Sequence, residues 1–258
     1  MSVHPSRRLS TNLLSKTLAI AAWLTAVIVL AIGALASGPA ENVLYSFQGG
    51  SNDGAAPYAG PVADNAGNLY GTTFFGGPGL FGVGIVFELS PPARKGEAWT
   101  ETILLYFNNT DAYAGPWSPV VRDADGNLYG NTWFGGECGG GLIFELSPPA
   151  QQGGTWTETE LGSLGCYDSD VYSPQAGLTL DQAGNIYGTA STGGTHCPDI
   201  GGCGGVFEFA KPTQPGGAWT ESVIYNFPGS DNVENGGGGT MGGLAIDSAG
   251  ALYGTTVY

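Results

Sequence analysis

The chain has 258 residues and a formal net charge of −15, with 22 acidic against 7 basic residues. So acidic a surface repels a phosphate backbone, which argues against nucleic acid as a partner. Glycine accounts for 46 residues. Beyond residue 40, long helical patterns are absent, and residues that favour strands are common. This composition predicts short strands joined by glycine-rich turns.

The first 36 residues form a separate element. Three cations precede an uncharged, mostly apolar stretch that ends in a small-x-small sequence: Arg7, Arg8, Lys16, residues 18–36 and Ala34-Leu35-Ala36. The pattern predicts a signal peptide over 1–36. If it is not cleaved, the apolar stretch is long enough to be a membrane anchor. Both alternatives leave the basic end in the cytoplasm and place the linker 37–42 and the rest of the chain outside.

From residue 43 onward the chain repeats a block of about 58 residues. Each copy has an aspartate six residues before the tyrosine of an Asn-(Leu/Ile)-Tyr-Gly core, and a weaker last copy has Ala251 in place of the asparagine. In the first three copies a Val-Phe-Glu-Leu type run and Trp-Thr-Glu follow. The aspartates are Asp64, Asp123, Asp181 and Asp247, and the copies span 43–102, 103–160, 161–222 and a shorter 223–258.

The second copy predicts four strands, over 119–123, 127–133, 142–146 and 156–164. Four strands joined by short loops form an antiparallel meander, and tandem meanders are typical of β-propeller blades. Solenoids compete, but their longer repeats are helical. Trp156, in the fourth strand, is expected to be buried, so Trp156→Ala should destabilise the fold severely.

The predicted fold class is therefore all-β: a β-propeller-like array of four-stranded antiparallel blades, preceded by an N-terminal hydrophobic helix. Residues 43–47 resemble the end of a fourth strand, and the last copy stops at Tyr258 within its second strand. Together these pieces lack the Val-Phe-Glu-Leu strand of a fourth blade. We expect about 3.5 blades, an incomplete ring and a chain that is a fragment of a longer propeller.

These motifs resemble the GloVer tandem repeat of "choice-of-anchor" exported bacterial proteins. They are similar, more distantly, to the NHL propeller repeat, which shares the Asp-x-x-Gly-Asn-(Leu/Ile)-Tyr pattern. The resemblance covers residues 43–258. It implies a propeller-like fold and display outside the cell, and it brings no catalytic residue or substrate.

All four cysteines lie in the part expected to be exported, and an oxidising compartment favours disulfides. The spacing suggests one bridge within a loop and one between adjacent blades. A metal site is the alternative, but its spacing matches no standard zinc pattern. The expected bridges are Cys197–Cys203 and Cys138–Cys166, and the alternative ligands are His196, Cys197, Asp199 and Cys203.

Loops of a propeller alternate between two faces, and the long loops of this chain are expected on one face, where function is most often found. Aromatic residues there could stack on sugar rings or partner side chains, or simply pack the loops onto the blades. They are Tyr58, Tyr113, Trp117, Trp133 and Tyr172.

The same face carries acidic residues, interpreted as solvated loop acids, with oxygen ligation of calcium as the alternative. They are Asp53, Asp111, Asp168, Asp170, Asp231 and Glu234. The repeated aspartates at positions 64, 123, 181 and 247 are instead interpreted as structural, because an aspartate that begins a turn can bond backbone N–H groups two residues on.

Support for catalysis is thin. The part expected to be exported has one histidine, His196, and hence one base for a Ser-His-Asp triad. Carboxylate pairs for glycoside cleavage remain open, but the glutamates at 88, 145 and 208, and those at 101, 158 and 221, recur in each copy. No catalytic residue and no cofactor are expected, with calcium as the open alternative.

The sequence thus favours an exported, non-enzymatic scaffold for binding or display, with a glycan or a protein as ligand. One alternative is an extracytoplasmic carbohydrate-active or other hydrolytic propeller enzyme. Another is a structural envelope or matrix protein that assembles through open blade edges. Membrane contact is expected only through residues 18–36, and the oligomeric state stays open.

Overall fold

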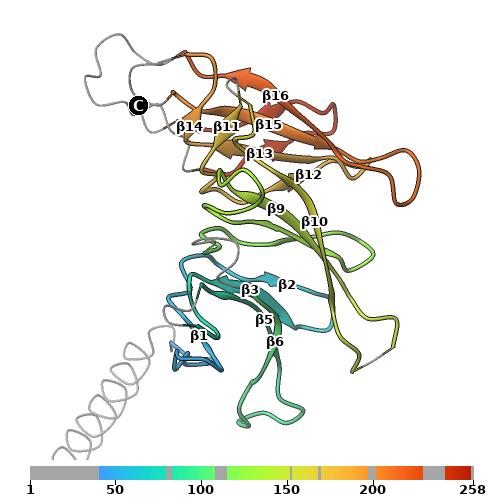
Figure 1. Ribbon diagram of the computed structural model, residues 1–258. Coiled ribbons are helices and arrows are strands. Elements are labelled where there is room, and N and C mark those ends of the chain that lie inside the picture. Colours follow the sequence, from blue (N-terminus) through green and yellow to red (C-terminus); the bar gives the residue numbers. More distant parts are fainter. Residues whose placement is uncertain are drawn as a thin grey trace, which may run out of the picture. The chain divides into compact units, whose positions relative to one another are not determined.

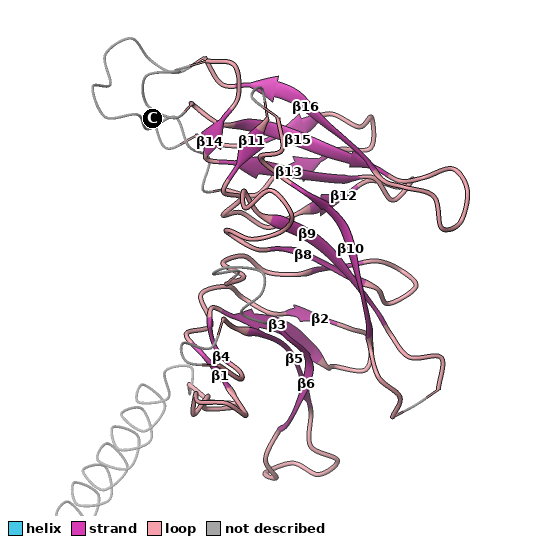
Figure 2. Cartoon of the chain, viewed as in Figure 1, coloured by secondary structure: helices cyan, strands magenta, loops and turns pink. Residues whose placement is uncertain are grey.

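The computed structural model describes residues 41–79, 83–107, 115–151, 153–167, 170–196, 202–228 and 242–256. Its contacts divide the chain into two units, 1–43 and 44–258. The helix predicted over 18–36 lies outside the described residues. The described part of the second unit is all-β (Figures 1 and 2). Within it, no helix is long and apolar enough to cross a membrane.

Three four-stranded antiparallel sheets follow one another along the chain, and we call them blades 1, 2 and 3 (Figure 2). Blade 1 contains β2 (Val62–Ala63), β3 (Leu69–Thr73), β5 (Ile85–Ser90) and β6 (Thr100–Tyr106). Blade 2 contains β7 (Val121–Arg122), β8 (Leu128–Asn131), β9 (Leu142–Ser147) and β10 (Thr157–Ser163). Blade 3 contains β12 (Thr179–Leu180), β13 (Ile186–Ala190), β15 (Gly205–Ala210) and β16 (Thr220–Asn226).

The fourth copy contributes a two-stranded sheet of β17 (Ala245–Ile246) and β18 (Leu252–Tyr253). The predicted all-β architecture of propeller-like, four-stranded antiparallel blades is therefore confirmed. The first two strands of the second copy are shorter than the sequence predicted, because the turn at Asp123 begins directly after β7.

Two short ladders were not predicted from the sequence. β1 (Gly54–Ala55) pairs with β4 (Phe75–Gly76), and β11 (Val171–Tyr172) pairs with β14 (Thr192–Gly193). Each ladder joins the segment that enters a blade to the loop that follows its second strand. The segment that enters a blade and the loop after its second strand therefore lie at the same end of that blade, as expected from the sequence.

The repeated aspartate organises the turn between the first two strands of each copy. Asp64 Oδ1 accepts hydrogen bonds from the backbone N–H groups of Ala66 and Asn68, at 2.8 and 2.9 Å. Its Oδ2 accepts from the Asn68 amide and from the Tyr70 hydroxyl. The glycine of the turn, Gly67, has φ of 87°, a conformation that strains other residues. The Asp-x-x-Gly-Asn-x-Tyr motif is therefore a self-contained structural turn.

The outer strand of each blade carries a β-bulge at the same position of the repeat. One extra residue, Leu104, Leu161 or Ile224, interrupts the register between the third and fourth strands. A bulge redirects the side chain that it contains. Leu104 and Leu161 belong to the hydrophobic clusters that join successive blades, so the bulge supplies a contact between blades.

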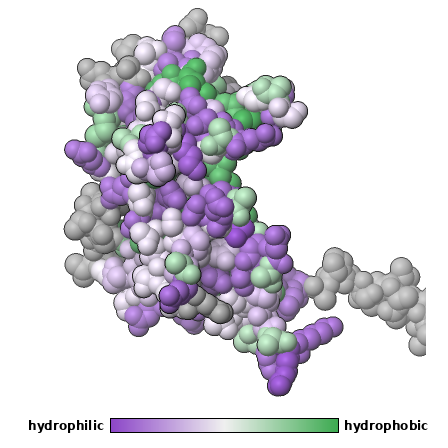
Figure 3. Space-filling view, turned by 90° about the vertical axis from the view of Figure 1, so that its right-hand side faces the viewer, coloured by the Kyte–Doolittle hydropathy of each residue, from purple (hydrophilic) through white to green (hydrophobic). Residues whose placement is uncertain are grey.

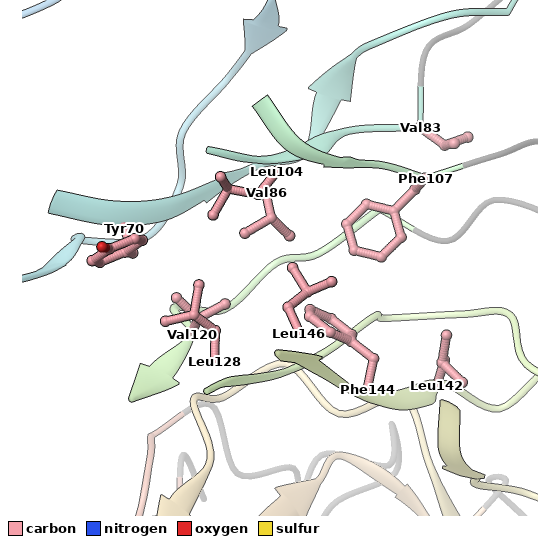
Figure 4. Close-up of a cluster of buried hydrophobic side chains, with 10 residues drawn as sticks. All are labelled: Tyr70, Val83, Val86, Leu104, Phe107, Val120, Leu128, Leu142, Phe144 and Leu146. Carbon is pink, nitrogen blue, oxygen red and sulfur yellow. The ribbon is translucent and has the colours of Figure 1, made fainter. Parts of the chain in front are cut away.

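A hydrophobic core joins blades 1 and 2 (Figure 4). From blade 1 and the residue after it, Val86, Leu104 and Phe107 face blade 2. From blade 2, Leu128 and Phe144 are fully buried against them. A second core of the same kind joins blades 2 and 3. The blades are therefore stabilised mainly by burying each sheet between its neighbours.

The glycine after each repeated tyrosine makes room for an aromatic ring of the third strand. A Cβ atom added at Gly71, Gly130 or Gly188 would lie 2.6, 2.4 or 2.3 Å from the ring of the phenylalanine opposite. Those rings belong to the third-strand residues Phe87, Phe144 and Phe207. The motif pairs Tyr-Gly with Val-Phe-Glu-Leu because the two sequences fit each other across one sheet.

The segment before blade 1 covers that blade's other face. Tyr45 and Phe47 pack on the cluster that contains Phe87, and the rings of Phe47 and Phe87 lie 4.9 Å apart. Trp156, which the sequence analysis placed in the core, is only half-buried and packs at the margin of the first cluster against Tyr70. The burial expected of Trp156 is therefore only partial, and the residue lies just before β10 rather than within the fourth strand.

Candidate functional site

Six aromatic residues gather at the loop end of blades 1 and 2, and we call them the aromatic patch. The backbone fixes their places, because the N–H of Phe74 donates to Ala56 O and that of Trp133 donates to Gly115 O. Each bond ties the end of a second strand to the segment that enters the same blade. The patch consists of Tyr58, Phe74, Phe75, Trp117, Trp133 and Phe134.

The rings of the patch form a continuous series of contacts. Tyr58 stacks on Trp117 with ring centroids 4.7 Å apart, and Trp117 meets Trp133 edge-on at 5.3 Å. Phe74 contacts Trp117 at 5.1 Å and so lies within the series. The outer members stay accessible, since Tyr58 is 56% exposed and Phe75 is 45% exposed. This arrangement offers ring faces that are already positioned for stacking.

Blade 3 has polar residues at the corresponding positions. Gln175 corresponds to Tyr58 and Trp117, Ser191 to Phe74 and Trp133, and Thr192 to Phe75 and Phe134. The Gln175 amide donates to the Ser191 hydroxyl at 3.1 Å. The backbone bond is kept, since the Ser191 N–H donates to Ser173 O. The scaffold therefore does not require aromatic residues here, and blades 1 and 2 differ from blade 3 in having them.

The structure brings together three of the aromatic residues singled out from the sequence: Tyr58, Trp117 and Trp133. Tyr172 lies in β11, in the segment that leads into blade 3, with its Cβ beside Gly140 and Gly165. Tyr113 lies outside the described residues.

Sequence reasoning missed Phe74, Phe75 and Phe134. The signal that could have found them is a pair of aromatic residues four and five positions after the motif tyrosine in the first two copies.

A disulfide joins Cys138 to Cys166, whose Cα atoms are 5.1 Å apart. Both cysteines are exposed, and the bridge ties the loop after β8 to the segment that leads into blade 3. It indicates an oxidising, extracytoplasmic environment. Cys203 is buried and disulfide-bonded, whereas Cys197, its expected partner, lies outside the described residues.

Two of the loop acids are buried rather than solvated, which corrects the expectation from the sequence. Asp53 is 7% exposed and Asp170 is 6% exposed. Asp170 accepts hydrogen bonds from the backbone N–H groups of Gly165, Cys166 and Val171, at 2.6 to 2.9 Å. These bonds shape the segment that enters blade 3, because a buried carboxylate must be paired. Asp111, Asp168, Asp231 and Glu234 lie outside the described residues.

Each of these buried aspartates has a glutamate beside it. At blade 1 the hydroxyl of Tyr45 donates to Glu101 at 3.0 Å and lies 3.4 Å from Asp53. Burial raises the pKa of Glu101, and the hydrogen bond from Tyr45 acts in the opposite direction. Burial and the two carboxylates raise the pKa of Tyr45 to about 12.

At blade 3 the corresponding pair is Asp170 and Glu221, which line a cavity of about 330 Å³. Burial raises the pKa of Glu221 to about 8, and the hydrogen bond with Asp170 and that carboxylate's charge add to the effect. Gly162 occupies the repeat position of Tyr45, and the ring of Phe209 lies against it. No hydroxyl reaches Glu221 from that position, so a neutral Glu221 carboxyl relieves the repulsion between the acids.

The metal alternative gains no support from the described residues, among which no group of three or more histidine, cysteine or acidic side chains could hold an ion. Of its expected ligands, His196 and Cys203 are described, while Cys197 and Asp199 are not. The acids at the repeated turns are occupied by the hydrogen bonds within the turn.

Comparison with known families identifies the family to which the chain belongs. Residues 34–258 match the model of the Gloeobacter/Verrucomicrobia repeat. The chain belongs to this family. The match covers all three blades and the β17–β18 sheet. The chain matched no curated protein. A member of this repeat family with three packed blades is a repeat scaffold.

Proposed function

We propose that this protein is an extracytoplasmic, non-enzymatic scaffold that binds a carbohydrate through the aromatic patch. The observation that carries the proposal is the stack of Tyr58 on Trp117 beside the exposed ring of Phe75. Sugar rings present C–H groups to aromatic faces, and a preformed stack loses little conformational entropy on binding. The polar equivalents in blade 3 support a role for the patch beyond packing.

The location proposed for this scaffold is outside the cytoplasm, secreted or anchored by residues 18–36. The exposed disulfide between Cys138 and Cys166 supports the compartment. The basic and then apolar pattern of the N-terminal sequence supports export.

Glycan binding can be tested with soluble xylan, laminarin and mannan, by affinity electrophoresis and by quenching of tryptophan fluorescence. We expect one class of glycan to bind, and Tyr58→Ala to weaken binding about tenfold or more, because an exposed stacking face is lost. Tyr58→Phe should retain binding. Gln175→Ala, at the equivalent position of blade 3, is the matched control and should change nothing.

Loss of binding in both Tyr58→Ala and Gln175→Ala would point to a general effect on the loops and contradict the proposal. If no glycan binds, but a protein partner binds and its binding is lost in Tyr58→Ala, the patch is a protein-binding surface instead.

A hydrolytic activity is the second candidate, and the Asp170–Glu221 pair favours it. A carboxyl group whose pKa is raised to about 8 can donate a proton at neutral pH. Its cavity is lined by Tyr167, Thr195 and Asn226 as well. Release of reducing sugar from the same glycans would show activity, and Glu221→Gln should abolish it. Turnover that Glu221→Gln leaves unchanged would exclude this site.

A further inference from the structure

The end of the blades opposite the aromatic patch carries a separate cavity. In Figure 1 the loop that joins β15 to β16 lies on the right, and the labels of β1, β11 and β14 at the long-loop end lie to its left. Figure 3 looks onto the right-hand end, where hydrophilic residues predominate. A ligand at this end is therefore expected to be polar.

The cavity lies between blades 2 and 3 and has a volume of about 640 Å³. Blade 2 lines it with Tyr129 and Glu145, and blade 3 lines it with Trp219 and the loop 211–218. Both blades are complete four-stranded sheets, and no lining residue borders a segment outside the described residues. Sites for small ligands have volumes of about 300–1,000 Å³, so the cavity is large enough for a sugar unit.

Lys211 brings a positive charge to this cavity. It directly follows β15, at the repeat position that Pro91 and Pro148 hold in blades 1 and 2. Its exposed side chain lies over the turn of its own blade, because a Cβ atom added at Gly184 would lie 3.2 Å from Nζ. The cation is therefore a feature of blade 3 rather than of the repeat.

Blade 2 has a cation over the corresponding turn, but from a different repeat position. A Cβ atom added at Gly126, which corresponds to Gly184, would lie 3.0 Å from Nη2 of Arg122. Arg122 belongs to β7. The other copies have apolar residues at its position, namely Ala63, Leu180 and Ile246. Two adjacent blades thus carry a cation at the same place although the repeat itself does not encode one there.

Neither cation forms an ion pair within the part of the chain that the structure describes. Nε of Arg122 is buried and lacks a hydrogen-bond partner. A buried polar group without a partner costs free energy. Leu180, which packs against the second core, shows that an apolar side chain fits at this position. Packing therefore does not account for these charges, which stand out in a chain with a net charge of −15.

The groups around the cavity fit an acidic sugar. The Lys211 ammonium can pair with a carboxylate, and the half-buried indole of Trp219 offers a ring surface to the C–H groups of a sugar. Glu145 and Glu160 line the same cavity, so a ligand with many negative charges is repelled. One carboxylate on each ring, with hydroxyl groups that donate to Glu145, suits this lining.

We propose that this cavity binds a uronic acid unit of an acidic saccharide, with Lys211 against its carboxylate and Trp219 against its ring. Arg122 supplies a second cation one blade away, at the same place over the turn, for a further carboxylate of the same saccharide. The site does not rest on the aromatic patch, which lies at the other end of the blades.

The test uses the full 258-residue chain in mild detergent, with trisaccharides of galacturonic acid and of mannuronic acid as probes in titration calorimetry. We expect one of them to bind, and its neutral counterpart, of galactose or mannose, to bind at least tenfold more weakly, because the carboxylate is absent. Lys211→Gln should weaken binding at least fivefold. Arg122→Leu should weaken binding without lowering the melting temperature, because blade 3 has leucine at this position.

The matched control for Lys211→Gln is Lys95→Gln, which removes the same charge from the loop between β5 and β6 at the same end of blade 1. It should bind like the native chain. The proposal is overturned if neither uronate binds, if Lys211→Gln binds like the native chain, or if Lys95→Gln weakens binding as much.

Two further outcomes would overturn it. If Tyr58→Ala abolishes uronate binding and Lys211→Gln does not, the aromatic patch is the site. If inorganic phosphate at equal concentration displaces the uronate, the cavity is a site for small anions and does not recognise the sugar.

Discussion

The interface between blades 1 and 2 and the groove between blade 3 and the β17–β18 sheet are built from the same repeat positions. In the first, Leu128 and Phe144 are fully buried between two sheets (Figure 4). In the second, Leu252 corresponds to Leu128, but none of the described residues supplies a phenylalanine at the position that corresponds to Phe144. The β17–β18 sheet keeps its turn and its register nevertheless. The comparison teaches that local hydrogen bonds form the hairpin, whereas burial depends on the third strand.

The largest effect is expected when a third-strand phenylalanine of a complete blade loses its ring. Phe144→Ala should lower the free energy of unfolding by about 3–5 kcal/mol, because a fully buried aromatic leaves a cavity between blades 1 and 2. Urea denaturation measures this loss. If Phe144→Ala left the midpoint unchanged, the interface would not be a close-packed core.

The bulge residue gives a direct comparison of the two regions. Leu161→Ala should cost about 2–5 kcal/mol, because that side chain is buried between blades 2 and 3. Ile224→Ala, at the same position of the next blade, should cost less than about 1 kcal/mol, because the side chain is 44% exposed. Equal costs at the two positions would show that something covers the groove.

The repeated glycine allows the two regions to be compared by adding a single methyl group to each. Gly130→Ala should destabilise by about 1–3 kcal/mol, because its Cβ would overlap the ring of Phe144. Gly254→Ala should change stability by only a few tenths of a kcal/mol, because no ring lies there and Leu244 can move. Thermal melting of the two variants side by side is the measurement. A larger loss for Gly254→Ala than for Gly130→Ala would contradict the expected difference.

The last comparison concerns the equivalent carboxyl pairs at blades 1 and 3. The folded state raises the pKa of Glu221 from 4.5 to about 8, so it binds this proton more tightly than the unfolded state does. The stabilising contribution of the proton is complete below about pH 4.5 and is lost as the pH rises toward 8. Glu221→Gln should remove this part of the pH dependence.

The matched variant at blade 1 is Glu101→Gln, where the Tyr45 hydroxyl already donates to the carboxyl. Its effect on the pH profile of the urea midpoint should be weaker. A profile for Glu221→Gln that is parallel to that of the native chain between pH 5 and 8 would show that Glu221 does not hold the proton.

The candidate site was only partly predictable from the sequence. Tyr58, Trp117 and Trp133 stood out as aromatic residues on long loops, but their proximity depends on the stacking of blades 1 and 2. Phe74 was not found, because a phenylalanine that directly follows a strand does not by itself reveal which other rings it contacts. The burial of Asp170 was missed for a related reason, since its partners are backbone N–H groups of a turn.

The sequence by itself determined the repeat, the four strands of each blade, the turn at each aspartate and the class of fold. These features depend on contacts within one copy, and each copy encodes them in residues close together in the chain. Only the tertiary structure decided which side chains are buried between blades, which acidic side chains are buried, and where six aromatic rings meet. Such outcomes depend on packing between copies about 58 residues apart, and the sequence of one copy does not show which residues of another copy it contacts.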